Sequence, residues 1–177
     1  MTGLNCNRTL LFTGTGKGKT TAALGMVLRA SGHGLKSLII QFIKADDSTG
    51  EISALQHIPE VKIIQTGLGF LPEKDTPEFL KHQRTAIKGI KYAAEALASG
   101  KWDLIVLDEI VNAVSKGILD EYEVIEAIKK AALKTVIVLT GRHASEKLIK
   151  AADTVTEMRP LKHGFETGWA AQKGVEF

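Results

Sequence analysis

The sequence predicts an α/β domain with a mostly parallel β-sheet and helices on both faces. Apolar runs of strand length alternate with helix-like segments along the chain, and parallel neighbours need such crossover connections. The run at 104–107 is continuously apolar, which is typical of a strand buried on both faces. A chain of 177 residues is long enough for one compact core and too short for two ordinary domains. We therefore expect residues 1–177 to form a single domain.

Six strands are expected, because six apolar runs are bounded by polar residues, glycine or proline. They lie at 9–13, 37–42, 61–65, 104–107, 135–140 and 154–158. Four helices are expected between them, at 20–30, from 76 to about 100, from 120 to about 133, and at 145–152. The stretch at 66–74 holds two glycines and a proline and is expected to be a functional loop.

The long central helix has recognisable ends and one apolar face. Thr76 is the expected N-cap, Pro77 suits the first helical position, and Gly100 is placed to end the helix. Residues spaced by three and four should pack on the sheet: Phe79, Gln83, Ile87, Ile90, Ala94 and Leu97. For the next helix, Asp120 with Glu123 resembles a capping box.

Composition and charge exclude several classes of protein. Apolar residues make up 44% and charged residues 24% of the chain, which is ordinary for a globular protein, and no apolar run suits a membrane span or a secretory signal. A cytoplasmic protein is expected, in which the lone Cys6 is incidental. The net charge of +3 is too diffuse to predict nucleic-acid binding. Its one cluster is interpreted as the solvated side of a helix, with a docking patch for an acidic partner as the alternative: Lys81, Arg84, Lys88 and Lys91.

A glycine-rich basic run joins the first expected strand to the first helix: Thr13-Gly14-Thr15-Gly16-Lys17-Gly18-Lys19-Thr20. Glycines let the backbone turn N–H groups toward an anion, and the helix N-terminus adds its dipole. Lys19 supplies a positive charge for phosphate oxygens, and the Thr20 hydroxyl can bind Mg²⁺. The alternative is an ordinary Gly-rich turn, which the flanking strand and helix disfavour.

This run therefore predicts a phosphate-binding P-loop, and with it an NTPase-like fold of the RecA-like type. Thr13 stands where the strict pattern has its first glycine. The residues expected to contact ATP lie in the loop and the helix start: Gly14, Thr15, Gly16, Lys17, Gly18, Lys19, Thr20 and Thr21. Lys17 has no role in the ordinary motif, so a solvent-facing position is the alternative for it.

Two acids follow the most apolar strand. Asp108 and Glu109 come directly after Leu107 and have the form of a Walker B segment, which holds a metal near the phosphates. Both strand ends should open into one crevice. The predicted metal ligands are therefore Thr20, Asp108 and Glu109, although acids at a strand end can also be simple loop or helix-start residues.

The sequence resembles one P-loop family, the ATP:corrinoid adenosyltransferases, from about residue 8 to 177. The resemblance is carried by ordered matches at TGTGKGKTTAA (13–23), RASGHG (29–34), QFIK (41–44), LDE (107–109), TGR (140–142), ADTVTEMRP (152–160), KHGF (162–165) and AQKG (171–174). It implies that ATP and a reduced corrinoid are the substrates, with Mg²⁺ or Mn²⁺ as cofactor.

In the implied reaction, Co(I) attacks the 5′ carbon of ATP and expels triphosphate. Because Co(I) is already a strong nucleophile, the protein needs to align the reactants and stabilise the leaving charge, and no general base is required. The resemblance implies catalytic roles for Lys19, Thr20 and Glu109 and a reversed polarity of bound ATP. It also implies a homodimer, a flavoprotein reductant, and no nucleic-acid or membrane partner.

The family also uses an aromatic pair to wedge the lower axial ligand away from the cobalt. Here the corresponding stretch is Thr66-Gly67-Leu68-Gly69-Phe70, so Leu68 and Phe70 are the expected corrinoid contacts. Ordinary core packing under a loop is the alternative. Family members often carry an extra segment before the first strand, whereas about seven residues precede it here.

Arg142 follows the fifth expected strand, where its guanidinium could reach a phosphate or a ribose. Pairing with a carboxylate such as Asp153 is the alternative. Two other functions remain open for the whole chain. One is a P-loop phosphotransferase of the nucleoside-kinase type, and the other is an ATP-dependent binding module.

Overall fold

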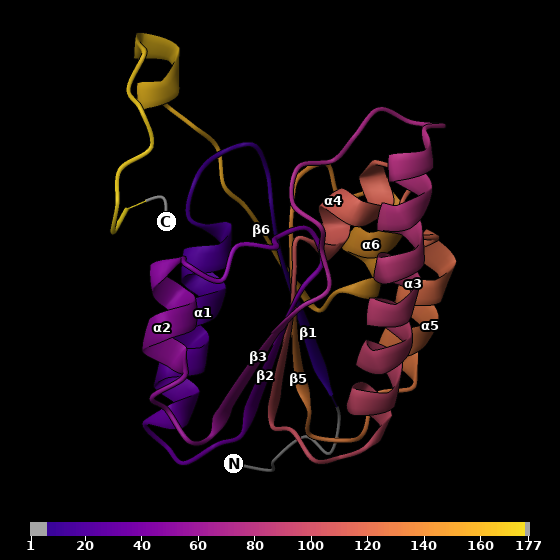
Figure 1. The fold of residues 1–177 in the computed structure, drawn as a ribbon. Coiled ribbons are helices and arrows are strands. Elements are labelled where there is room, and N and C mark those ends of the chain that lie inside the picture. The colour runs from indigo at the N-terminus through magenta and orange to yellow at the C-terminus, as the bar shows by residue number, and fades with distance from the viewer. Residues whose placement is uncertain (1–6, 176–177) are drawn as a thin grey trace.

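The computed structural model describes residues 7–175 of the chain. Its centre is a six-stranded sheet in which every paired strand is parallel to its neighbour. The strands are β1 (Arg8–Thr13), β2 (Ser37–Gln41), β3 (Val61–Gln65), β4 (Leu104–Asp108), β5 (Val136–Thr140) and β6 (Thr154–Glu157). Their order across the sheet is β3-β2-β4-β5-β1-β6, so β5 separates the first strand from β4 (Figure 1).

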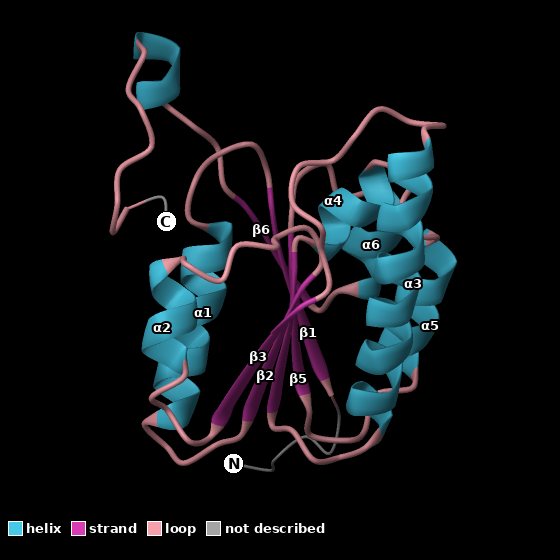
Figure 2. Ribbon diagram, in the orientation of Figure 1, coloured by secondary structure: helices cyan, strands magenta, loops and turns pink. Residues whose placement is uncertain are grey.

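Helices cover both faces of the sheet (Figure 2). On one face lie α1 (Lys19–Ser31) and α2 (Gly50–Leu55), and on the other α3 (Pro77–Ala98), α4 (Ile110–Ser115), α5 (Glu121–Lys129) and α6 (Glu146–Ala151). A 3₁₀ turn, η1 (Gly164–Thr167), belongs to the C-terminal tail that rises beyond the sheet. The predicted α/β class, with a parallel sheet and helices on both faces, is confirmed.

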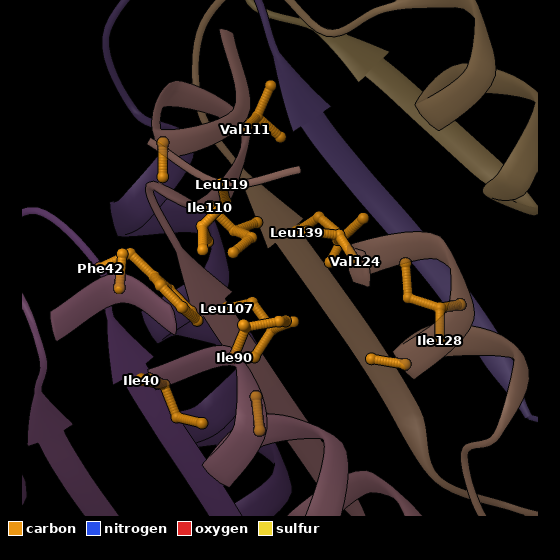
Figure 3. Close-up of a cluster of buried hydrophobic side chains, with 14 of the residues drawn as sticks. Ile40, Phe42, Ile90, Leu107, Ile110, Val111, Leu119, Val124, Ile128 and Leu139 are labelled. Carbon is orange, nitrogen blue, oxygen red and sulfur yellow. The ribbon is translucent and has the colours of Figure 1, made fainter. Parts of the chain in front are cut away.

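The core divides into two clusters because successive residues of a strand point to opposite faces. Val106 packs with α1, whereas Ile105 and Leu107 pack with α3 and α5. The cluster that contains Leu107 is drawn in Figure 3, where Ile90 of α3 lies beside Leu107. This sharing explains why β4 is apolar at every position up to Asp108.

The six strands agree with the sequence-based boundaries to within one residue at each end. The ends of α3 are also confirmed. The Thr76 hydroxyl accepts a hydrogen bond from the Phe79 amide at 3.2 Å, Pro77 begins the helix, and Gly100 follows it with φ of 64°.

The predicted packing face of α3 is partly wrong. Ile87 is 37% exposed, whereas His82, Ala86, Gly89 and Ala93 are buried. Ala86, Gly89 and Ala93 extend the buried face. At Gly89 the helix comes close to the chain after β3, since a Cβ there would lie 2.6 Å from the Thr66 hydroxyl. Apolar periodicity overlooks small residues, since they contribute little hydrophobicity.

Other helices also differ from expectation. Asp120 caps α5 through the Tyr122 amide at 2.9 Å, and the helix ends at Lys129 rather than near 133. It ends early because the Ala132 amide bonds to the Leu97 carbonyl of α3 at 2.8 Å. The short helices α2 and α4 were not predicted.

Three sequence-based expectations concern the surface and the termini. The four basic side chains of the α3 cluster are exposed, as expected of a solvated helix face. Within residues 7–175, no helix is long and apolar enough to cross a membrane. Cys6 lies outside the described residues.

Candidate nucleotide site

The carboxyl ends of β1, β4 and β5 meet at one edge of the sheet, where a cavity of about 580 Å³ opens. Its walls come from segments far apart in the chain. They include the loop after β1, Glu109 after β4, Arg142 after β5, and Gly174 with Val175 of the C-terminal tail. The structure thus brings the predicted loop and the predicted acid pair to one site.

The loop between β1 and α1 depends on glycine at two kinds of position. Gly14 and Gly18 have φ of 95° and 102°, which side-chain-bearing residues rarely adopt. Gly14 and Gly16 also press against the chain after β6, since a Cβ on either would lie 2.4 or 2.7 Å from the Met158 carbonyl oxygen. The Gly16 amide donates a hydrogen bond to that oxygen at 2.7 Å.

Thr13 occupies the first-glycine position of the motif and has a structural contact there. It is buried at the end of β1, and its hydroxyl accepts a hydrogen bond from the Ala144 amide at 3.3 Å. The substitution therefore ties the loop base to the segment after β5.

Lys19 begins α1 and is only 6% exposed. Its ammonium donates to the carbonyl oxygens of Gly14 at 2.8 Å and Gly16 at 2.6 Å, so it lies inside the loop. Burial, followed by the nearby charge of Arg142, lowers the pKa of Lys19 below its ordinary value. The negative charge of a bound polyanion would offset both effects and favour the charged ammonium.

Asp108 is almost fully buried at the end of β4 and accepts hydrogen bonds on both oxygens. Its Oδ1 accepts from the Thr20 hydroxyl at 2.8 Å and from the Thr140 hydroxyl at 2.7 Å. Its Oδ2 accepts from the Gln41 side-chain amide at 3.2 Å, and Gln41 in turn accepts from Gln65 at 2.9 Å. These donors hold the carboxylate in one orientation.

In contrast to Asp108, Glu109 has a side-chain oxygen that accepts no hydrogen bond. Its backbone is left-handed, with φ of 62°, and is held there by a hydrogen bond from its amide to the Thr140 hydroxyl at 2.9 Å. Its Oε2 is buried with no hydrogen-bond partner. Burial, with a smaller effect from the Asp108 charge, raises the pKa of Glu109. An unpartnered carboxylate oxygen on a cavity wall suits contact with a cation.

The oxygen donors of Thr20, Asp108 and Glu109 are the kind that Mg²⁺ prefers. Within the described residues, no group of three or more His, Cys, Asp or Glu side chains is placed to hold a metal. Mg²⁺ usually takes one or two carboxylates and completes its shell with water and substrate phosphates. The residues therefore fit a metal that arrives with the nucleotide.

Two residues of this site were not predicted as functional. Lys44 and Glu51 line the cavity, and their side chains are 2.8 Å apart from Nζ to Oε1. Lys44 Nζ also lies 3.9 Å from Asp108 Oδ2. Burial opposes the charge of Lys44, but Asp108, Glu51 and Glu109 outweigh it and raise its pKa. The sequence signals for this part of the site were the polar residue Gln41 at the end of β2 and the family-like run QFIK (41–44), which includes Lys44.

The remaining loop residues take different positions. Gly16, Lys17, Gly18 and Thr21 line the cavity, whereas Thr15 is exposed and Gly14 offers its carbonyl to Lys19.

Arg142 also lines the cavity, and its amide donates to Asn112 Oδ1. Asp153, the alternative partner for Arg142, accepts instead from the Thr9 amide at 2.7 Å. Arg142, whose charge acts on Lys19, is thus part of the cavity wall.

Leu68 and Phe70 are not core residues. Leu68 is 47% exposed and Phe70 is fully exposed, so the core-packing alternative is wrong. The loop base is nevertheless held firmly, because the Gly69 amide bonds to the Ile43 carbonyl at 2.9 Å. A Cβ on Gly67 would lie 2.1 Å from the Ile43 carbonyl carbon. Leu68 and Phe70 are thus exposed to solvent. Their loop lies at the same end of the sheet as the loop between β1 and α1 (Figure 1).

The parallel sheet, the glycine loop around Lys19 and the acid pair after β4 define a P-loop nucleotide-binding protein. Residues 6–177 match the family described as ATP:corrinoid adenosyltransferase BtuR/CobO/CobP. The chain belongs to this family, as its sequence motifs indicated.

Curated relatives agree with this assignment. A corrinoid adenosyltransferase of Pseudomonas aeruginosa is 43% identical over 169 residues, which cover 95% of this chain and 82% of the relative. The corrinoid adenosyltransferase of Escherichia coli K12 is 36% identical, with 95% and 84% covered. Among solved structures, a KaiC-like protein of Pyrococcus horikoshii aligns with a TM-score of 0.49 and 16% identity, covering 88% of this chain and 71% of the other.

Proposed function

We propose that the chain transfers the 5′-deoxyadenosyl group of ATP to the Co(I) centre of a reduced corrinoid and releases triphosphate. The observation that carries this proposal is family membership, with 43% identity to a corrinoid adenosyltransferase over almost the whole chain. The site suits the chemistry because its basic groups surround a cavity large enough for a nucleotide.

The reaction needs no proton transfer. The electron pair of Co(I) forms the cobalt–carbon bond, the bond between the 5′ carbon and its oxygen breaks, and triphosphate leaves with that bonding pair. The protein must therefore align the two reactants and stabilise the charge on the departing oxygen. We assign the second task to Lys19, whose ammonium is already inside the loop. The rest of ATP would be held by the other predicted nucleotide contacts: Gly14, Thr15, Gly16, Lys17, Gly18, Thr20, Thr21 and Arg142.

We assign the metal contacts to Thr20, Asp108 and Glu109. The support is the Thr20–Asp108 hydrogen bond and the unpartnered Glu109 oxygen. Bound Mg²⁺ or Mn²⁺ would neutralise charge on the triphosphate. Glu109 would then contact the cation through its buried Oε2, because no hydrogen-bond donor competes for that oxygen.

Leu68 and Phe70 are assigned to the corrinoid. A fully exposed phenylalanine on a tightly anchored loop has no packing role to explain it. Its ring and the Leu68 side chain could cover a corrin face and exclude water. Family likeness alone supports three further expectations: a homodimer, a flavoprotein electron donor, and action in the cytoplasm.

The deciding experiment mixes the protein with Mg²⁺, ATP and chemically reduced cobalamin and records visible spectra before and after illumination. Adenosyl transfer yields a photolabile cobalt–carbon bond and one triphosphate for each product. A phosphotransferase would release ADP, and a binding module would yield neither product beyond slow hydrolysis. Accumulation of ADP without a light-sensitive species would exclude the proposed reaction.

A further inference from the structure

A second basic group faces the nucleotide cavity from outside the P-loop. Lys44 follows β2, and the strand order places β4 and β5 between β2 and the loop-bearing β1. Lys19 and Lys44 both line the cavity, so they approach it from different strands. Lys44 belongs to the segment between β2 and α2, which the P-loop motif does not describe.

Lys44 lines the cavity, and its contacts leave part of its hydrogen-bond donor capacity unused. An ammonium has three N–H donors. Glu51 Oε1 takes one at 2.8 Å, whereas Asp108 Oδ2 at 3.9 Å is beyond hydrogen-bond distance. Asp108 is already satisfied by Thr20, Thr140 and Gln41. The ion pair with Glu51 therefore leaves N–H donors of the Lys44 ammonium for another acceptor.

The charge of the cavity wall favours a polyanion. Among the described residues, four basic side chains line the cavity against two acidic ones: Lys17, Lys19, Lys44 and Arg142 against Glu51 and Glu109. Glu51 is 16% exposed in its side chain and fixes the end of the flexible Lys44 stem at the wall. Holding a long side chain in place lowers the entropy that is lost when it binds a phosphate.

We propose that Lys44 is a second phosphate-binding cation, which contacts the polyphosphate from the β2 side while Lys19 holds it from the loop. Identifying this polyphosphate as the leaving triphosphate rests on the proposed function. The contact would then strengthen as negative charge develops on the departing oxygen, because charge-assisted hydrogen bonds are the stronger ones. Glu51 acts through Lys44 as a positioning residue.

The test uses inorganic tripolyphosphate and adenosine as separate probes, titrated into the intact protein by calorimetry. Lys44→Met removes the charge and keeps the stem, and it should weaken tripolyphosphate binding roughly tenfold or more. Adenosine affinity should stay unchanged. Lys44→Arg should restore most of the affinity. Lys101→Met, at an exposed position just beyond α3, is the matched control and should bind like the wild type.

Two further readouts separate this contact from a purely structural ion pair. The salt dependence of tripolyphosphate binding should become shallower in Lys44→Met, because one charge contact is lost. The ratio kcat/KM for ATP should also fall by roughly tenfold. Unchanged tripolyphosphate affinity in Lys44→Met, with or without a lower melting temperature, would overturn the inference. Because that titration involves no corrinoid, its result is independent of whether the wild type forms a photolabile product.

Discussion

The Thr20 hydroxyl donates a hydrogen bond to Asp108 Oδ1 across 2.8 Å, although the two residues are 88 positions apart. The bond joins the first turn of α1 to the carboxyl end of β4. It therefore places the hydroxyl of the P-loop and the first carboxylate of the acid pair side by side, although they belong to separate sequence motifs.

Thr20→Val removes this hydroxyl and keeps the side-chain shape. We expect the free energy of unfolding to change by about 1 kcal/mol or less, because Asp108 keeps its bonds from Thr140 and Gln41. The Mg²⁺ concentration for half-maximal rate should rise about tenfold, measured by titrating Mg²⁺ at saturating ATP. Thr85→Val, which removes a hydroxyl bonded only within α3, should leave that concentration unchanged. An unaltered Mg²⁺ requirement in Thr20→Val would contradict the metal assignment.

Lys19→Ala should lower the rate of adenosyl transfer by about a hundredfold or more, because the polyphosphate loses a preorganised positive charge. Product is measured from the light-sensitive absorbance. Lys36→Ala, at an exposed lysine beside β2, serves as the control. A near-normal rate in Lys19→Ala, with the control also normal, would remove the role assigned to this ammonium.

Glu109→Gln should stabilise the ligand-free protein in the presence of a chelator. The pKa of Glu109 is raised above its ordinary value of 4.5 by burial and by Asp108, so the folded state favours the protonated form. The protonated Glu109 side chain therefore contributes to the stability of the folded state below about pH 4.5. This contribution is lost as the pH rises through the folded-state pKa of Glu109. The neutral amide avoids that loss.

The gain from Glu109→Gln should therefore be larger at pH 8 than at pH 4.5. At pH 8 we expect about 1 kcal/mol, or roughly 2–4 °C in Tm for a chain of this size. Thermal unfolding at the two pH values provides the measurement. The same variant should be impaired in catalysis. A gain that is equal at both pH values would show that the carboxylate is not the destabilising group.

Phe70→Ala should affect the reaction that starts from Co(II) more than the reaction that starts from pre-reduced Co(I). The reason is that the proposed wedge acts on the lower ligand of Co(II). Because the ring is fully exposed, the free energy of unfolding should change by less than about 0.5 kcal/mol. Leu161→Ala, at another fully exposed apolar position, is the control. Equal losses by the two routes would remove the wedge role.

Gly67→Ala should destabilise the fold by about 1–3 kcal/mol, because the new methyl group would overlap the backbone of Ile43. It should also impair corrinoid adenosylation by displacing the loop that carries Leu68 and Phe70. Gly25→Ala is the matched control, since no atom lies within 4 Å of its added Cβ in α1. That control should stabilise the protein by about 0.5–1 kcal/mol. Denaturant unfolding compares the two, and equal stability would contradict the close approach.

The strands and the phosphate loop could be predicted because their information is local. An apolar run such as 104–107 and a glycine pattern such as 14–18 are read from neighbouring residues. The short helices α2 and α4 could not be found in this way. In α2 only Ile52 and Leu55 are buried, and α4 begins with β-branched residues that favour strands.

Only part of the site could be predicted from the sequence. Lys19, Thr20, Asp108 and Glu109 belong to motifs with fixed spacing, whereas the Lys44–Glu51 pair crosses a loop and depends on how α2 docks. The exposure of Phe70 was also undecidable, because a loop phenylalanine can point inward or outward with the same neighbours in sequence. Both questions are settled by tertiary contacts.

The position of β1 has a consequence for how the chain acquires its structure. Within residues 7–175 this strand pairs with β5 and β6, and the Gly16 amide of its loop bonds to the Met158 carbonyl. In the sequence, β2, β3, β4 and the helices between them separate β1 from these two partner strands. Such distant pairings slow folding, since a long stretch of chain must be ordered before they form. The shape of the glycine loop therefore depends on chain segments that lie far from it in the sequence.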